Sequence, residues 1–99
     1  MLPKRSIIPV AGVTFHKDAV KATQVGDKVT LVHTPDNQYD GYAVEISVVG
    51  VGVVGFVPAS LNRRFSDPGS GGIVGGEWEG VVEEKLRHED VEGLRIRLV

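Results

Sequence analysis

The chain has 99 residues, of which 41% are apolar, and its formal net charge is −2. This length allows one compact domain and excludes a two-lobed enzyme, and the apolar fraction excludes a disordered tail. The absence of cysteine excludes disulfides and thiol chemistry, and no apolar run approaches the roughly 20 residues that span a bilayer. We therefore expect a single domain over residues 1–99 and a cytoplasmic location.

Charge is distributed unevenly along the chain. Residues 1–65 carry seven Lys or Arg and five Asp or Glu, whereas residues 66–99 carry four and eight. A polyanion would therefore meet the first two-thirds of the chain. The imbalance is small, so a polyanion held by charge alone would bind weakly and with strong salt dependence.

Valine-rich segments separated by glycine and proline favour strands and turns over helices. The pattern predicts a first strand over residues 7–15, a short helical turn over 16–23 and a strand with alternating apolar residues over 28–33. Residues 34–41 (TPDNQYDG) predict a turn. The physical reasons are that Pro fixes φ, Asp and Asn side chains bond the nearby backbone, and Gly tolerates positive φ.

The middle of the chain predicts a hairpin and a helix. Residues 42–49, with an apolar face that begins at Tyr42, and residues 53–57 predict two strands joined by a tight link at 50–52. Pro58 is suited to begin a short helix through Phe65, with Leu61 and Phe65 facing the core from positions four residues apart.

The last third predicts a flexible glycine-rich loop over residues 66–76, and then a closing hairpin of strands 78–87 and 94–99. Six short strands with one or two short helices predict a mostly β fold, namely a small, partly open six-stranded β-barrel.

Three glycines, Gly50, Gly52 and Gly55, spell the G-x-G-x-x-G pattern of dinucleotide-binding folds. That pattern binds a pyrophosphate only where it opens a helix within a βαβ unit, and here the following residues continue a strand. A hairpin is therefore the favoured interpretation of these glycines.

No other pattern indicates catalysis or a metal. Residues 36–41 resemble the start of a calcium loop, but Ser47 stands where the bidentate Glu belongs. The three histidines are not at metal-ligand spacing, and we expect them to be solvated or buried in the core. No nucleophile with a neighbouring base is visible, so we expect no enzyme activity and no cofactor.

The order of motifs over residues 10–65 resembles the HIRAN domain family. The resemblance is carried by VAGVTFHKDAVKA (10–22), GDKVTLVHTPDNQYDGYAVEI (26–46) and VVGFVPASL (53–61). The combination of the Asn37-x-Tyr39-Asp40 turn with Gly55-Phe56 downstream is more specific than any single piece. The last third of the chain matches no motif of the family.

This resemblance implies an OB-like barrel that binds the 3′ end of single-stranded DNA. Members of the family occur at the N-termini of helicase-like remodelling proteins and as stand-alone proteins. Their aromatic residues stack on terminal bases, the Asn and Asp of the turn reach the terminal nucleotide and its hydroxyl, and basic residues contact phosphate. Carried over by position, Asn37, Tyr39 and Asp40 match the turn, and Phe15 matches a stacking aromatic on the first strand.

The chemistry of these residue types suits an end-selective site. Asn offers a donor and an acceptor to a base edge, and Asp accepts a hydrogen bond from a free 3′-hydroxyl while repelling a phosphate at the same place. A Tyr or Phe face contributes about 1–3 kcal/mol when a base stacks on it. From the residues alone, Asn37 and Asp40 could instead satisfy backbone donors within the turn.

Three positions depart from DNA-binding members of the family. Thr14 stands where these members can carry Arg, His16 stands where a second aromatic such as Tyr can stand, and Pro58-Ala59 stand where a basic residue can assist. Lys17, Arg63 or Arg64 could supply the missing phosphate contacts. At the end of a helix, the two arginines could also simply complement the helix dipole.

We therefore expect a non-catalytic module that binds single-stranded DNA at a free 3′ end and serves to target or protect DNA in repair, replication or remodelling. The alternative is a protein-interaction module that keeps the barrel without the DNA site. We expect a monomer whose partners are single-stranded DNA and a helicase- or nuclease-type protein, with no membrane. The residues expected to bind nucleic acid are Phe15, His16, Lys17, Asn37, Tyr39, Asp40, Phe56, Arg63 and Arg64.

Overall fold

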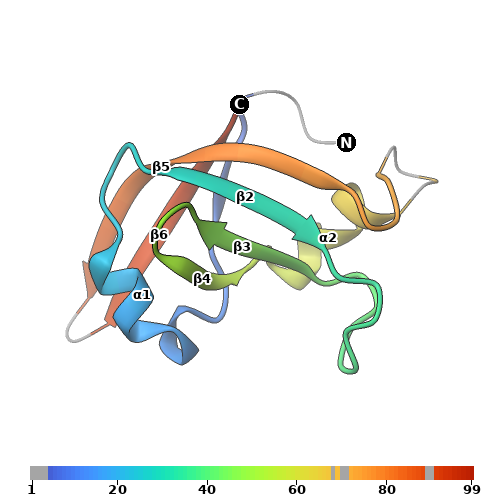
Figure 1. Cartoon of the computed structure of the whole chain (residues 1–99), viewed down its shortest axis with the longest axis horizontal. Helices are drawn as coiled ribbons and strands as arrows, with labels where there is room; N and C mark the ends of the chain where they lie inside the picture. Colours follow the sequence, from blue (N-terminus) through green and yellow to red (C-terminus); the bar gives the residue numbers. More distant parts are fainter. Residues whose placement is uncertain (1–4, 68, 70–71, 89–90) are drawn as a thin grey trace.

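The computed structural model describes residues 5–67, 69, 72–88 and 91–99. Within these residues, six strands pair antiparallel in the order β1-β6-β5-β2-β3-β4 and form one curled sheet (Figure 1). The strands are β1 (Ile7–Pro9), β2 (Lys28–His33), β3 (Val44–Val48), β4 (Gly52–Phe56), β5 (Glu77–His88) and β6 (Val91–Leu98). The helical segments are η1 (Val13–Phe15), α1 (Lys17–Ala22) and α2 (Ala59–Ser66).

The two edges of the sheet meet just beyond β1. Ala11 and Phe56 form an isolated antiparallel bridge in which each backbone N–H donates to the carbonyl of the other residue, both at 2.8 Å. This short bridge joins the first strand to β4, so the curled sheet becomes a half-barrel held together at one point. The predicted mostly β fold, an OB-like and partly open six-stranded barrel with short helices, is confirmed.

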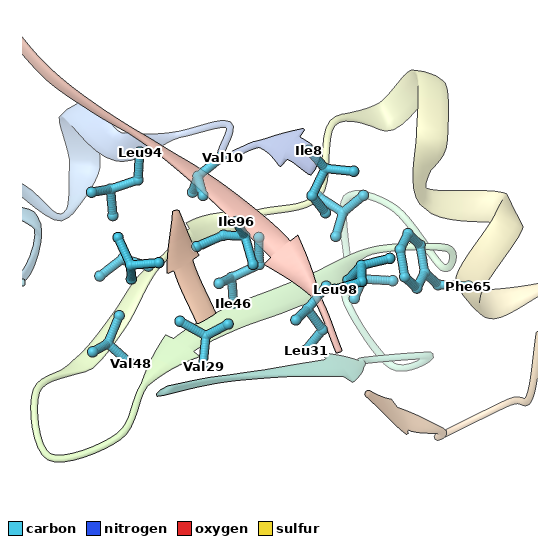
Figure 2. Packing of buried hydrophobic residues seen from close by; sticks show 14 of the residues in the cluster. Ile8, Val10, Val29, Leu31, Ile46, Val48, Phe65, Leu94, Ile96 and Leu98 are labelled. Carbon is cyan, nitrogen blue, oxygen red and sulfur yellow. The ribbon is translucent and has the colours of Figure 1, made fainter. Parts of the chain in front are cut away.

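The core fills the inside of the curled sheet (Figure 2). Strands β2, β3 and β6 alternate between core and outside as their sequences predict, because successive side chains of a strand point to opposite faces. α2 adds Phe65, which is fully buried and meets the ring of Trp78 edge to face at 5.2 Å. The alternating buried residues of these strands are Val29, Leu31, Val44, Ile46, Val48, Leu94, Ile96 and Leu98.

Gly55 makes the closure of the half-barrel possible. The register of β3 against β4 shifts between Ile46 and Ser47, so β4 carries an extra residue just before Gly55. Gly55 has φ +157°, and a Cβ atom there would overlap the carbonyl oxygen of Ala11. A bulge bends a strand and re-aims the next side chains, and here it precedes Phe56. Gly55 therefore allows the close approach of the Ala11 backbone. Gly50, with positive φ, lies in the hairpin link, and Gly52, also with positive φ, begins β4 opposite Val48. The interpretation of the three glycines as a hairpin is confirmed.

The predicted first strand (residues 7–15) is too long, since β1 ends at Pro9 and Ala11 makes only an isolated bridge. Gly12 adopts φ +76°, and the N–H of Phe15 donates to the Gly12 carbonyl at 3.0 Å, so residues 13–15 form the single turn η1. Phe15 therefore lies on a 3-10 turn, where the sequence predicted a strand. Similarly, the strand predicted from residue 42 begins at Val44, and Tyr42 still belongs to the turn.

The remaining predicted elements agree with the structure to within a few residues. α1 and α2 match the two predicted helical segments, and Leu61 packs partly buried against the core as expected. The closing hairpin is longer than predicted, since His88 pairs with Val91. The loop prediction for 66–76 falls partly on residues 68, 70 and 71, and the turn predicted over 88–93 falls partly on residues 89 and 90, all of which lie outside the described residues. No helix in the described part of the chain is long and apolar enough to cross a membrane.

Candidate nucleic-acid interface

A shallow cleft of about 340 Å³ opens where η1, the 34–41 turn, the end of β4 and the start of α2 converge. η1 and the turn approach the end of β4 from different sides (Figure 1). The lining is mostly apolar, and its polar side chains are Asn37, Asp40 and Asn62 together with the Tyr39 hydroxyl. The full lining consists of Ala11, Gly12, Phe15, Asn37, Tyr39, Asp40, Ala43, Phe56, Val57, Ala59 and Asn62.

Two aromatic rings stand exposed at this cleft. Phe15 is 86% exposed and Tyr39 is 89% exposed, although each side chain would gain by burial. Phe56 contributes a half-buried ring, and a Cβ atom at Gly12 would lie 3.8 Å from Phe56 and 3.9 Å from Phe15. Gly12 therefore lies between these two rings and leaves the cleft open there. Exposed aromatic faces beside an apolar hollow are suited to stack flat, planar ligands.

Asn37 organises the turn through its side chain. Its Oδ1 accepts the backbone N–H groups of Tyr39 at 2.9 Å and Asp40 at 3.1 Å. Such Asx bonding fixes a turn that no regular ladder supports. The amide Nδ2 of Asn37 makes no hydrogen bond to any described residue, so it remains available as a donor at the cleft. Asn37 therefore satisfies backbone donors within the turn, as the residues alone allowed, and its Nδ2 is still free to donate.

Asp40 is held rigidly at the wall of the cleft. Its Oδ1 accepts the backbone N–H of Tyr42 at 2.8 Å, and its Oδ2 accepts Nδ2 of Asn62 at 2.8 Å. Asn62 is itself only 3% exposed, so it presents a fixed donor from α2. Each carboxylate oxygen can accept more than one hydrogen bond, so Asp40 keeps acceptor capacity after both contacts.

The sequence interpretation missed Asn62. A signal was available, since Asn62 precedes Phe65 by three positions and therefore lies on the apolar face of α2. A polar residue on such a face requires a hydrogen-bond partner, and here the partner is the half-buried Asp40.

The basic residues expected at the site lie around the cleft and none of them lines it. The ring of His16 packs near that of Phe56, with centroids 6.4 Å apart. Lys17 follows on the first turn of α1, beside Phe15 in a neighbouring hollow. The Arg63 guanidinium lies 4.3 Å over the ring of Tyr42, and Arg64 is exposed on α2. The structure thus brings together Phe15, Asn37, Tyr39, Asp40 and Phe56, and leaves the cations outside.

His33 anchors the base of the turn. Its Nδ1 accepts the backbone N–H of Gly75 at 3.0 Å, so the Nε2 atom carries the proton and donates to the carbonyl of Gly41 at 2.8 Å. The side chain is 4% exposed, which agrees with the core position allowed for the histidines. His33 therefore ties the residue after Asp40 to the segment that precedes β5.

The structure is a small OB-like half-barrel with a shallow, aromatic-lined cleft at one end of β4. Comparison with protein families matches residues 4–75 to the HIRAN domain, and the chain belongs to this family, which is a DNA-binding module. The matched residues extend beyond the motifs at 10–65 on both sides and end before β5. Comparison with curated proteins and with solved structures gave no match.

Proposed function

We propose that this HIRAN domain binds single-stranded DNA at a free 3′ end, without catalysing a reaction on it. The observation that carries the proposal is the cleft itself, in which two exposed aromatic rings stand beside a rigid carboxylate. Terminal bases stack on Phe15 and Tyr39, while Asp40 accepts a hydrogen bond from the terminal hydroxyl. Asn37 donates through its unused amide group to a base edge.

The same carboxylate supplies the end selectivity. A continuing strand or a terminal phosphate would bring a second negative charge next to Asp40, and like charges about 4 Å apart near a protein surface repel by several kcal/mol. A free hydroxyl carries no charge and donates a hydrogen bond instead. The cleft therefore distinguishes the end of a strand from its interior by charge, and needs no particular base sequence.

The alternative, a protein-interaction module, rests on Thr14 in place of a basic residue, on the acidic last third of the chain and on the negative net charge. That acidity is partly neutralised in the structure, because three of its carboxylates are ion-paired with cations of the same hairpin. The pairs are Glu83 with Arg97 at 2.8 Å, Glu84 with Arg95 at 3.2 Å and Glu92 with Lys85 at 3.3 Å. The DNA-binding proposal rests on the cleft, and the alternative is an outcome of its test.

The test compares three fluorescently labelled single strands by anisotropy at low and moderate salt. One strand has a free 3′-hydroxyl, one a 3′-phosphate, and one is circular. We expect the free hydroxyl to bind at least about tenfold more tightly than the other two. Equal binding of all three would leave only a generic single-strand binder, and no binding at low salt would favour the protein-interaction role.

An isosteric variant separates the charge of Asp40 from its structural bonds. In Asp40→Asn the new side chain keeps an oxygen for the Tyr42 N–H, and a flip of the Asn62 amide restores the other hydrogen bond. We expect this variant to remain folded and to lose most of its discrimination against the 3′-phosphate. Asp36→Asn is the matched control, because Asp36 is an exposed residue of the same turn that does not line the cleft.

A further inference from the structure

The cleft lacks the cations that a DNA backbone requires. Among its lining residues Asp40 is the one charged side chain, and no Lys, Arg or His is included. Phosphate contacts supply most of the affinity of a protein for DNA, and they come from Lys and Arg or from backbone N–H groups. If a strand ends in this cleft, its remaining phosphates must be held on an adjoining surface.

Two further hollows lie next to the cleft along α1. Phe15 lines both the cleft and a shallow depression over the junction of η1 and α1. Thr14, Lys17 and Asp18 line that depression and also the next groove, of about 200 Å³, which lies between α1 and the start of β6. The three hollows are therefore neighbours along the surface, in an order that begins at the exposed ring of Phe15.

The far groove presents two lysines on one face of α1. Lys17 and Lys21 both line it and are both exposed. Residues four apart on a helix have Cβ atoms about 5–6 Å apart, so the two ammonium groups can reach successive phosphates of an extended strand. Neither lysine is ion-paired with another described residue. The groove also contains Asp18, and Glu92, whose carboxylate lies 3.3 Å from Nζ of Lys85.

The other candidate cations are less well placed to guide a strand. Arg63 packs over Tyr42, whose N–H is bound by Asp40, so Arg63 lies on the side of the cleft where the proposed strand terminates. Arg64 lines none of the three hollows.

We propose that the DNA strand leaves the cleft across Phe15 and runs along α1, where Lys17 and Lys21 bind its backbone phosphates. This route rests on the 3′-end function proposed above, and it adds the direction in which the strand leaves the cleft. Nucleotides at the terminus occupy the cleft, and those further from the end lie in the groove between α1 and β6. The Asp18 carboxylate repels the same phosphates and so limits the affinity of the groove for DNA.

The test measures affinity against strand length. Unlabelled strands of two to eight nucleotides with a free 3′-hydroxyl compete against a labelled strand, at several salt concentrations. The variant is the double change Lys17→Ala/Lys21→Ala in the full chain. The matched control is Arg5→Ala/Lys28→Ala, which removes the same charge from two exposed residues outside the three hollows.

We expect the unaltered chain to bind longer strands more tightly, and the α1 variant to lose most of that gain while binding the dinucleotide normally. The slope of log K against log salt should fall by about 1.4, or about 0.7 per lost phosphate contact, in the α1 variant alone. Asp18→Asn should tighten binding of long strands and leave the dinucleotide unchanged.

An α1 variant with unchanged length dependence and salt slope would overturn the route, and so would loss of both in the control variant. Preference for a free 3′-hydroxyl would survive either of these results. Absence of that preference in the unaltered chain, at every length, would instead overturn the proposed function and with it the route.

Discussion

Removal of the exposed aromatic rings isolates the contribution of stacking. Phe15 and Tyr39 are 86% and 89% exposed, so truncation of either ring removes little buried surface from the folded state. We therefore expect Phe15→Ala and Tyr39→Ala to change the free energy of unfolding by less than about 0.5 kcal/mol. Stability would be measured by urea unfolding with Trp78 fluorescence as the probe.

The same substitutions should weaken DNA binding markedly. Loss of one stacked base costs about 1–3 kcal/mol, which corresponds to a roughly 5- to 150-fold increase in Kd. Anisotropy titrations with a free 3′-hydroxyl strand at constant salt measure this change. Phe15→Trp should retain binding, and Val49→Ala, at an exposed apolar residue that does not line the cleft, should have no effect. Unchanged Kd values in both alanine variants would refute stacking at this cleft.

Further predictions concern the frame that supports the site. Gly55→Ala should lower the free energy of unfolding by about 3–5 kcal/mol, because a Cβ there overlaps a backbone carbonyl, whereas Gly50→Ala, in open space at φ +83°, should cost about 1–2 kcal/mol. Urea unfolding of both variants would contradict this reasoning if their costs were equal. Phe65→Ala should cost about 3–5 kcal/mol in the same assay, since the ring is fully buried. Long-range ¹H–¹⁵N NMR should find His33 as the Nε2–H tautomer, and a proton on Nδ1 would exclude its hydrogen bond from the Gly75 N–H.

The apolar periodicity predicted a strand correctly where the sequence also marks both of its ends with turn residues. β2 (Lys28–His33) agrees residue for residue, because an alternating apolar pattern lies between a Gly-Asp pair and a dense turn signal. The prediction of the first strand extended too far, because apolar and β-branched residues continue on both sides of Gly12 up to Phe15. β1 ends at Pro9, and beyond it Ala11 pairs with Phe56 across the barrel before the positive φ of Gly12 turns the chain into η1.

The candidate site was predictable in its residue types and not in its geometry. Motifs far apart in the sequence supplied Phe15, Tyr39 and Asp40, which the barrel brings around one cleft. The partner that fixes Asp40, Asn62, was missed because its role depends on how α2 packs against the turn. Likewise, the sequence offered Lys17, Arg63 and Arg64 as equivalent cations, and only the arrangement of hollows distinguishes between them.

The most direct test of the cleft as the DNA site is a ¹H–¹⁵N NMR titration of the full chain with a short strand bearing a free 3′-hydroxyl. We expect the largest shift changes on backbone amides of residues 11–16 and 37–43, and little change when the strand ends in a 3′-phosphate. Shift changes confined to the β5–β6 hairpin, or equal changes with both strands, would contradict this expectation.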